Sequence, residues 1–335
     1  MRAATMPWLK RAAWIAALFA LGVIVFGAFV RLSNAGLSCP DWPTCYGQLT
    51  WPTQTHEVAS ANAAFPERPV ESDKAWREQA HRILVGVLSL LTLAVAALAF
   101  ANRRNLGRVA YVAYAAVAVI VFQALLGMWT VTLKLLPLVV SAHLLGGLSL
   151  FALLALVALW CTLAPAGTRE NAALRRGAFA LLAVLAMQIA LGGWTSSNYA
   201  ALACGSDFPT CLGQWAPPTD FHNGFVLWRG VGVDYEGGVL DAPARAAIQL
   251  AHRAGALITF LAGLALAFAA WRRRETRAFG VAIGALLLLQ VLLGIGNVKL
   301  GLPLPVAVAH NGVAALLLLA LLALCVRLRP AQRVN

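Results

Sequence analysis

The sequence predicts an all-α integral membrane protein of eight transmembrane helices, arranged as two tandem parallel four-helix bundles. Three observations predict this fold. Hydrophobic residues make up 61% of the 335 residues and charged residues only 12%, about half the roughly 25% usual in soluble domains. Eight hydrophobic runs are long enough to cross a bilayer, and the second half of the chain repeats the first. The composition excludes a soluble enzyme, a disordered regulator and a disulfide-rich secreted module.

Each predicted span is continuously apolar over about 20 residues, the length that a helix needs to cross the hydrocarbon core. The strands of a membrane barrel would be shorter and would alternate in polarity. The first span is long and lacks a small-residue cleavage site, so we expect a retained helix rather than a signal peptide. The expected spans are residues 9–31, 78–101, 108–133, 138–163, 174–196, 245–271, 277–299 and 303–328.

The basic residues predict the orientation of the chain. Of the 26 Lys and Arg residues, 16 lie on the side of the N-terminus with only two acids, whereas the long loops, about 32–77 and 197–244, lie on the other side. The positive-inside rule therefore places both termini in the cytoplasm, and a bacterial inner membrane is the simplest location. These bases lie in short segments at helix ends, so the net charge of +13 does not indicate nucleic-acid binding.

The repeat divides the chain into two halves, residues 1–165 and 166–335. Residues 43–48 read PTCYGQ and residues 209–214 read PTCLGQ. Because each half contains an even number of spans, both halves enter the membrane in the same direction and the repeat is parallel. Further matches in the same order are Ser33-Asn34 with Ser197-Asn198, Gln123 with Gln290 and Lys134 with Lys299.

All six histidines also match across the repeat. The pairs are His56 with His222, His81 with His252, and His143 with His310. The last four are expected about 5–10 Å inside the outer helix ends, at a rise of 1.5 Å per residue. Two neutral imidazoles on facing helices of an apolar bundle are suited to bind a haem iron axially. The alternative is that each histidine only hydrogen-bonds a neighbouring helix.

Basic residues at the same outer level are candidates for binding the haem propionates. They are Arg82, Arg253, Lys134 and Lys299. Each one lies near the end of a predicted span that also carries, or adjoins, a candidate haem ligand.

Glu78 distinguishes the two halves. It lies three residues before His81, on the same helix face, whereas the matching residue of the second half is Gln249. An acid beside a metal-bound substrate can act as a base or stabilise positive charge. An interfacial acid in a first helical turn, favourable to the helix dipole, explains the residue equally well.

The cysteines agree with the predicted topology. Cys39 and Cys45 share the first outer loop, and Cys204 and Cys211 share the second. An oxidising outer compartment favours two loop disulfides, whose role is either to staple the loops or to relay electrons or accept the thiols of a partner. Cys161 and Cys325 are expected to be buried thiols. His56 and His222, in the loops, either bind a metal or hydrogen-bond the loop, and the second role is favoured.

The chain as a whole resembles the haem A synthase family. The resemblance is carried by residues 31–43 (RLSNAGLSCPDWP), by the pattern Glu-x-x-His-Arg at 78–82 and by the matching His-Arg at 252–253. It implies oxidation of the C8 methyl group of haem O to a formyl group, giving haem A for cytochrome oxidase.

The resemblance also implies a role for each candidate residue. His81 and His143 hold the substrate haem O, His252 and His310 hold a haem B cofactor, and Glu78 is the catalytic acid. The cysteine pairs match the subtype with loop disulfides, and their different spacings mean that the two loops differ in shape.

Other functions explain part of this pattern. A dihaem b-type electron carrier explains the four histidines but neither Glu78 nor the long loops, and a membrane thiol oxidoreductase explains only the loop cysteines. A transporter would show Gly or Pro interruptions near the midplane of its helices, whereas the prolines here lie at helix ends and in loops. The expected partners are the lipid bilayer, a haem O synthase and a second copy of the chain. The sequence does not identify the electron acceptor.

Overall fold

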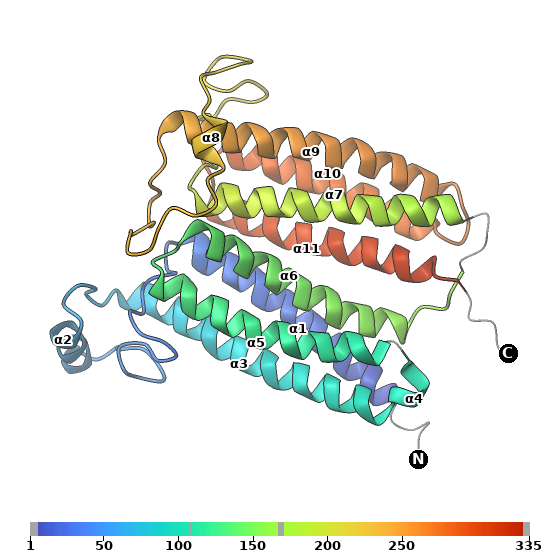
Figure 1. Cartoon of the computed structure of the whole chain (residues 1–335), viewed down its shortest axis with the longest axis horizontal. Coiled ribbons are helices and arrows are strands. Elements are labelled where there is room, and N and C mark those ends of the chain that lie inside the picture. The colour runs from blue at the N-terminus through green and yellow to red at the C-terminus, as the bar shows by residue number, and fades with distance from the viewer. Residues whose placement is uncertain (1–5, 108, 167–170, 331–335) are drawn as a thin grey trace.

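The structure is a computed structural model that describes residues 6–107, 109–166 and 171–330. Within these ranges the chain is all-helical, and eight of its helices are long and apolar enough to cross a membrane (Figure 1). The eight are α1 (Met6–Leu32), α3 (Ser72–Ala101), α5 (Val109–Thr132), α6 (Pro137–Trp160), α7 (Ala172–Ser197), α9 (Ala242–Trp271), α10 (Arg277–Lys299) and α11 (Leu304–Arg327). The connections contain three short helices, α2 (Thr55–Ala64), α4 (Arg103–Leu106) and α8 (Phe221–Gly224).

The eight predicted spans are confirmed, with one systematic difference at the starts of α3 and α9. Helix α3 begins six residues before the predicted start at position 78, and α9 begins three residues before position 245. Helical structure continues through polar residues outside the apolar run because its backbone bonds do not depend on hydrophobic side chains. His81 and His252 therefore lie nine and ten residues into their helices, deeper than the predicted first turn.

The helices of each half contact one another in a closed ring. In the first half α1 packs on α3, α3 on α5, α5 on α6, and α6 on α1. In the second half α7 packs on α9, α9 on α10, α10 on α11, and α11 on α7. The two sets meet where α1 and α6 contact α11 and where α6 contacts α7. Figure 1 shows the two sets side by side, with the axes of all eight long helices nearly parallel.

Small residues allow α1 to lie at the centre of this packing. Four alanines on one of its faces are buried, namely Ala13, Ala16, Ala17 and Ala20. Small side chains let the backbones of membrane helices approach closely. Long apolar side chains such as Leu90 and Leu292 are instead exposed, as expected for a surface that faces lipid.

The long loops gather at one end of the helices. Figure 1 shows α2 and α8 at this end, whereas α1 begins and α11 ends at the other. In each loop a disulfide closes a tight turn, Cys39–Cys45 in the first and Cys204–Cys211 in the second. The two predicted loop disulfides are therefore present. Of the free cysteines, Cys325 is buried as predicted, but Cys161 at the end of α6 is only half-buried.

Two of the predicted repeat matches are out of register. The residues with left-handed backbone after α1 and α7 are Asn34 (φ 51°) and Tyr199 (φ 52°). Asn34 is therefore structurally equivalent to Tyr199, one residue beyond Asn198, with which the sequence match had paired it. Lys134 (φ 47°) lies in the α5–α6 turn, and its equivalent in the α10–α11 turn is Gly301 (φ 71°), not Lys299. Short matches at helix ends occur by chance, whereas the turn geometry marks the true equivalence.

Candidate active site

The four span histidines occupy equivalent places in the two halves. His81 is on α3 and His143 on α6, whereas His252 is on α9 and His310 on α11. His143 and His310 each lie six residues after the first residue of their helix, which is about 9 Å along the axis. Within each half the two helices that carry these histidines are opposite members of the ring of helix contacts. All four rings are half-buried.

These imidazoles fit the binding of a haem iron. The Nδ1 atoms of His81, His143 and His310 are buried without any hydrogen-bond partner, which is costly for a polar atom. The alternative of purely structural histidines leaves these Nδ1 atoms without partners, although His310 does contact Gln290 of a neighbouring helix through its Nε2 atom. A ring whose Nδ1 atom is buried can still offer Nε2 to a metal. The donor set, two neutral imidazoles per half in apolar surroundings, suits iron.

Glutamine side chains approach the histidines from neighbouring helices. Gln123 of α5 donates to the carbonyl oxygen of His143 at 2.8 Å, and Gln188 of α7 lies 3.1 Å from both Nδ1 and the carbonyl oxygen of His252. Gln290, the equivalent of Gln123, instead lies 3.3 Å from Nε2 of His310. The sequence had marked Gln123 and Gln290 only as a repeat match, and it carried no signal for Gln188.

A single substitution explains why Gln123 and Gln290 differ. The carboxamide of Gln123 rests on Gly146, where a Cβ atom would lie 2.2 Å from Oε1. The residue equivalent to Gly146 is Val313, at the same offset that relates His143 to His310. A valine leaves less room for a carboxamide than a glycine does, which is consistent with the contact of Gln290 to the imidazole rather than to the backbone of its histidine.

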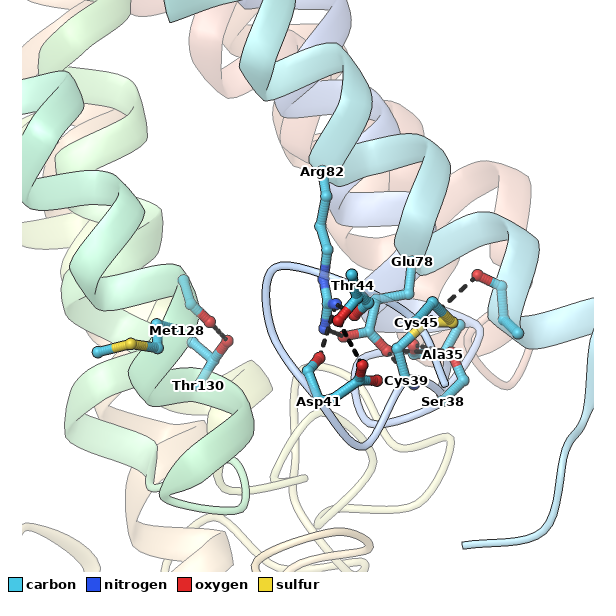
Figure 2. A network of polar contacts seen from close by, with 12 residues as sticks. Ala35, Ser38, Cys39, Asp41, Thr44, Cys45, Glu78, Arg82, Met128 and Thr130 are labelled. Atoms are coloured by element: carbon cyan, nitrogen blue, oxygen red, sulfur yellow. Dashed lines mark hydrogen bonds and ion pairs between the residues drawn. A yellow bond between two sulfur atoms is a disulfide. The ribbon is translucent and has the colours of Figure 1, made fainter. Parts of the chain in front are cut away.

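Glu78 contacts the first loop. Its Oε2 atom accepts hydrogen bonds from the Ser38 hydroxyl at 3.0 Å and from the Cys39 N–H at 2.9 Å. Its Oε1 atom accepts a bond from Nη2 of Arg82 at 2.6 Å. Figure 2 shows Glu78 and Arg82 leaving α3 toward the loop that carries the Cys39–Cys45 disulfide. The carboxyl group is buried, so these contacts hold it in place.

The second half lacks this arrangement. The residue equivalent to Glu78 is Gln249, which is also buried but whose Oε1 atom has no hydrogen-bond partner. The asymmetry predicted from the sequence therefore extends to the surroundings of the two side chains. At this helix position only the first half carries an acid.

The two arginines proposed as propionate ligands bind the loops. Nη1 of Arg82 donates to the carbonyl oxygens of Asp41 and Thr44, and Arg253 donates to those of Asp207 and Thr210. Each guanidinium thus clamps the loop of its own half onto the helix that bears the histidine. The side chains of Lys134 and Lys299 are exposed, and no ion pair within the described part of the chain includes either. A propionate role for these four residues stays a prediction.

Asp41 organises the turn of the first loop. Its carboxylate accepts hydrogen bonds from the Thr44 hydroxyl and from the N–H groups of Tyr46 and Gly47. Burial alone would raise the pKa of Asp41, but these donors outweigh it and hold the pKa below its usual range. Burial raises the pKa of Tyr46 to about 12, so its hydroxyl remains a donor to the carbonyl oxygen of Arg68.

The second loop also reaches across to the first half. Tyr235 is 1% exposed and packs with Leu37, Leu126 and Leu136 of the first half. Its N–H donates to the carbonyl oxygen of Lys134 at 3.1 Å. On either side of it, Asp234 and Glu236 form ion pairs with Arg68. The segment 234–236, here called the strap, therefore closes the outer end of the first half.

The loop histidines show no sign of a metal site. His56 and His222 are both exposed. Nowhere in the described ranges do three or more His, Cys, Asp or Glu side chains group in a way that could hold a metal ion.

The sequence is similar to proteins of one known family. The family model described as cytochrome oxidase assembly protein, COX15-CtaA, matches residues 10–322. The chain is 45% identical over 318 residues to the haem A synthase of Shewanella oneidensis, and the match covers 94% of each chain. It is 27% identical over 339 residues to the haem A synthase of Caulobacter vibrioides, with 94% of each chain covered. It is 26% identical over 305 residues to that of Bacillus pumilus, covering 86% and 85%.

Proposed function

The chain belongs to the COX15-CtaA family of cytochrome oxidase assembly proteins, and from this membership we propose which residues carry out its chemistry. It is a haem A synthase, an oxidoreductase that converts haem O to haem A for cytochrome oxidase. The proposal concerns the two halves: we infer that they are tandem parallel four-helix bundles, residues 1–165 for the substrate and residues 166–335 for a cofactor.

One observation carries the assignment of the halves. Both halves have two histidines on separate helices, but only the first has an acid, Glu78, three residues before one of them, where the second has Gln249. Oxidation of a methyl group to a formyl group releases protons as well as electrons, so the substrate belongs where a proton acceptor is present. We therefore assign haem O to His81 and His143, and haem B to His252 and His310.

Haem B, when bound, would supply one-electron redox chemistry through its iron. The residues of the chain then have separable tasks. The histidines hold the two macrocycles, and the apolar helices around them exclude water. Each of the two additions of water to the methyl carbon of haem O breaks a C–H bond and releases two protons, together with two electrons that pass to an external acceptor. Glu78 would accept one of these protons. Its Oε1 atom is the better placed of the two oxygens, because it bonds only Arg82 and retains a free lone pair.

The fixed position of Glu78 favours this role. Its three donors come from α3 and from the first loop, so the carboxyl group cannot rotate without breaking hydrogen bonds. General acid–base catalysis by a positioned group typically contributes about 100- to 10,000-fold to a rate. The Arg82 clamp and the Cys39–Cys45 disulfide hold the loop side of this arrangement.

Extraction of the bound haems tests the proposal. The chain is expressed together with a haem O synthase and purified, and its non-covalent haems are separated by chromatography with mass detection. We expect haem B together with haem O, its hydroxylated intermediate or haem A. Haem B alone would instead indicate an electron-carrying dihaem protein.

The same extraction on single variants tests the halves. His81→Ala and His143→Ala should lose haem O and retain haem B, whereas His252→Ala and His310→Ala should lose haem B. Retention of both haems by all four variants would contradict the ligand assignment. Loss of haem B from His81→Ala would show that the halves are assigned in reverse.

A further inference from the structure

Each of the four histidines rests against a glycine of a neighbouring helix. A Cβ atom built on Gly27 of α1 would lie 2.9 Å from Cε1 of His81, and one on Gly127 of α5 would lie 3.5 Å from Cε1 of His143. In the second half the corresponding distances are 3.3 Å from Gly192 of α7 to His252 and 3.2 Å from Gly294 of α10 to His310.

The contact is repeated at equivalent positions. Gly27 and Gly192 are separated by the same offset as the left-handed turn residues Asn34 and Tyr199, which follow them on α1 and α7. Gly127 and Gly294 share the offset that relates His143 to His310. The glycines are therefore present in both halves. Other residues near the histidines, such as Gln188 and Val313, are found in the second half only.

These glycines are not simple helix-crossing glycines. At Gly280 a Cβ atom would collide with the backbone of Ala267 and Trp271 on the adjacent helix. At Gly27 the three nearest atoms to a Cβ all belong to the His81 ring, and at the other three positions the only atoms within 4 Å belong to the histidine. The absent side chain makes room for an imidazole and for nothing else.

The atom in contact explains what the glycine does. Cε1 lies between the two ring nitrogens, so any displacement of Cε1 also moves the nitrogen that would bind iron. At Gly27 a Cβ atom would additionally lie 3.4 Å from Nε2 and 3.5 Å from Nδ1 of His81. A histidine ring cannot give way as a flexible chain end can, and it would have to rotate or withdraw.

We propose that Gly27, Gly127, Gly192 and Gly294 are positioning residues that seat the four imidazoles against helix backbone and so set the ring orientation for haem ligation. The inference rests on the proposed ligand role of the histidines. Glycine is a poor helix former, so glycine at these positions lowers the stability of the helix while it makes room for the imidazole.

The test compares Gly27→Ala with Gly22→Ala. Both residues are on α1, and a Cβ atom on Gly22 meets nothing within 4 Å. In the purified, haem-loaded protein, Gly27→Ala should bind the haem of the first half about 10- to 100-fold more weakly, the usual effect of losing support for a metal ligand. The low-spin electron paramagnetic resonance signal of any haem retained there should shift, because it depends on imidazole orientation. Gly22→Ala should change neither.

A second variant keeps the test decisive if Gly27→Ala fails to fold. Combining it with His81→Ala removes the ring that the new methyl group would meet, so the double variant should be as stable as His81→Ala alone. If the double variant is less stable than His81→Ala, the glycine serves helix packing and the proposal is wrong. Unchanged haem content and resonance signal in a folded Gly27→Ala protein would also overturn it.

The outcomes separate this inference from the proposed function. If His81→Ala retains every haem, the ligand assignment itself is wrong. If His81→Ala loses haem while Gly27→Ala is normal, only the positioning role fails. The distances also predict an order of severity, with Gly127→Ala milder than Gly294→Ala.

Discussion

Glu78 illustrates how one residue acquires a role through its partners. The carboxyl group is buried, and its three donors are two residues of the first loop and Arg82 on its own helix. A buried acid without such partners would be strongly disfavoured. The same helix position in the second half carries Gln249, whose Oε1 atom has no partner. At this helix position the two halves therefore differ in both the side chain and its hydrogen bonds.

Glu78→Gln tests the proton-transfer role with little change of shape. The amide retains the volume of the acid but cannot accept a proton, so we expect haem A formation to fall by about 100- to 10,000-fold while both haems remain bound. Turnover and haem content are measured on the same preparation. Glu67→Gln, in an exposed part of the same loop, is the control. Full haem A output from Glu78→Gln would remove Glu78 from the mechanism.

At the scale of elements, the two loops share one design. Each has a disulfide-closed turn and an arginine that donates to turn carbonyls, Arg82 in the first and Arg253 in the second. They differ in the carboxylate within the turn. The Asp41 carboxylate accepts hydrogen bonds from Thr44, Tyr46 and Gly47, whereas within the described residues the Asp207 carboxylate accepts one from the N–H of Gly213. The first loop is therefore the more strongly organised by its acid.

This difference predicts an acid-sensitive first loop. Because the pKa of Asp41 is lowered in the folded loop, its stabilising effect is complete above the ordinary value of about 3.9. The effect is lost as the pH falls through the lowered pKa. At neutral pH, Asp41→Asn should make Cys39–Cys45 easier to reduce, and this difference should vanish in strong acid.

The measurement is the rate at which a water-soluble phosphine reduces each disulfide, followed by mass spectrometry. Cys204–Cys211 in the same molecules is an internal control, since Asp41→Asn should not change its rate. An equal difference between wild type and Asp41→Asn at neutral and strongly acidic pH would contradict the role given to the Asp41 carboxylate.

At the scale of the whole molecule, residues of each half form hydrogen bonds and ion pairs with the other half. Arg31 at the end of α1 donates to the Tyr199 hydroxyl at 3.0 Å and to the carbonyl oxygen of Ser196 at 2.8 Å, both at the end of α7. The strap runs the opposite way, from the second loop to Arg68 and the α5–α6 turn. These contacts join the halves at the end of the helices where the long loops lie.

Tyr235→Ala should loosen this junction. Truncation of a fully buried aromatic side chain typically costs about 3–5 kcal/mol, so the variant should unfold at a lower temperature and its second loop should be cut faster by an added protease. Val233→Ala, at an exposed neighbour, should behave like wild type. If Tyr235→Ala had the same unfolding temperature and protease sensitivity as Val233→Ala, the strap would not stabilise the junction.

The orientation of the whole chain is tested by a reporter. The basic residues at the end where α1 begins and α11 ends predict that this end faces the cytoplasm. A green fluorescent protein fused to the C-terminus should therefore fluoresce, and alkaline phosphatase at the same position should be inactive. The opposite pattern would invert the proposed topology and place the disulfide loops in a reducing compartment.

The sequence by itself determined the helices and the equivalence of the histidines. The length and apolar character of a span are local properties, so the eight helices could be read from composition within a few residues. The repeat then related His81 to His252 and His143 to His310, and it isolated Glu78 as the acid without a counterpart.

Only the tertiary structure decided what these residues contact. Glu78 meets Ser38 across 40 positions of sequence, Tyr235 of one half closes the other, and Gly27 seats His81. Such contacts depend on the rotation of each helix about its axis and on how closely two backbones approach. Hydrophobicity does not encode either quantity, because every face of a membrane helix is apolar, and both are settled when the helices pack.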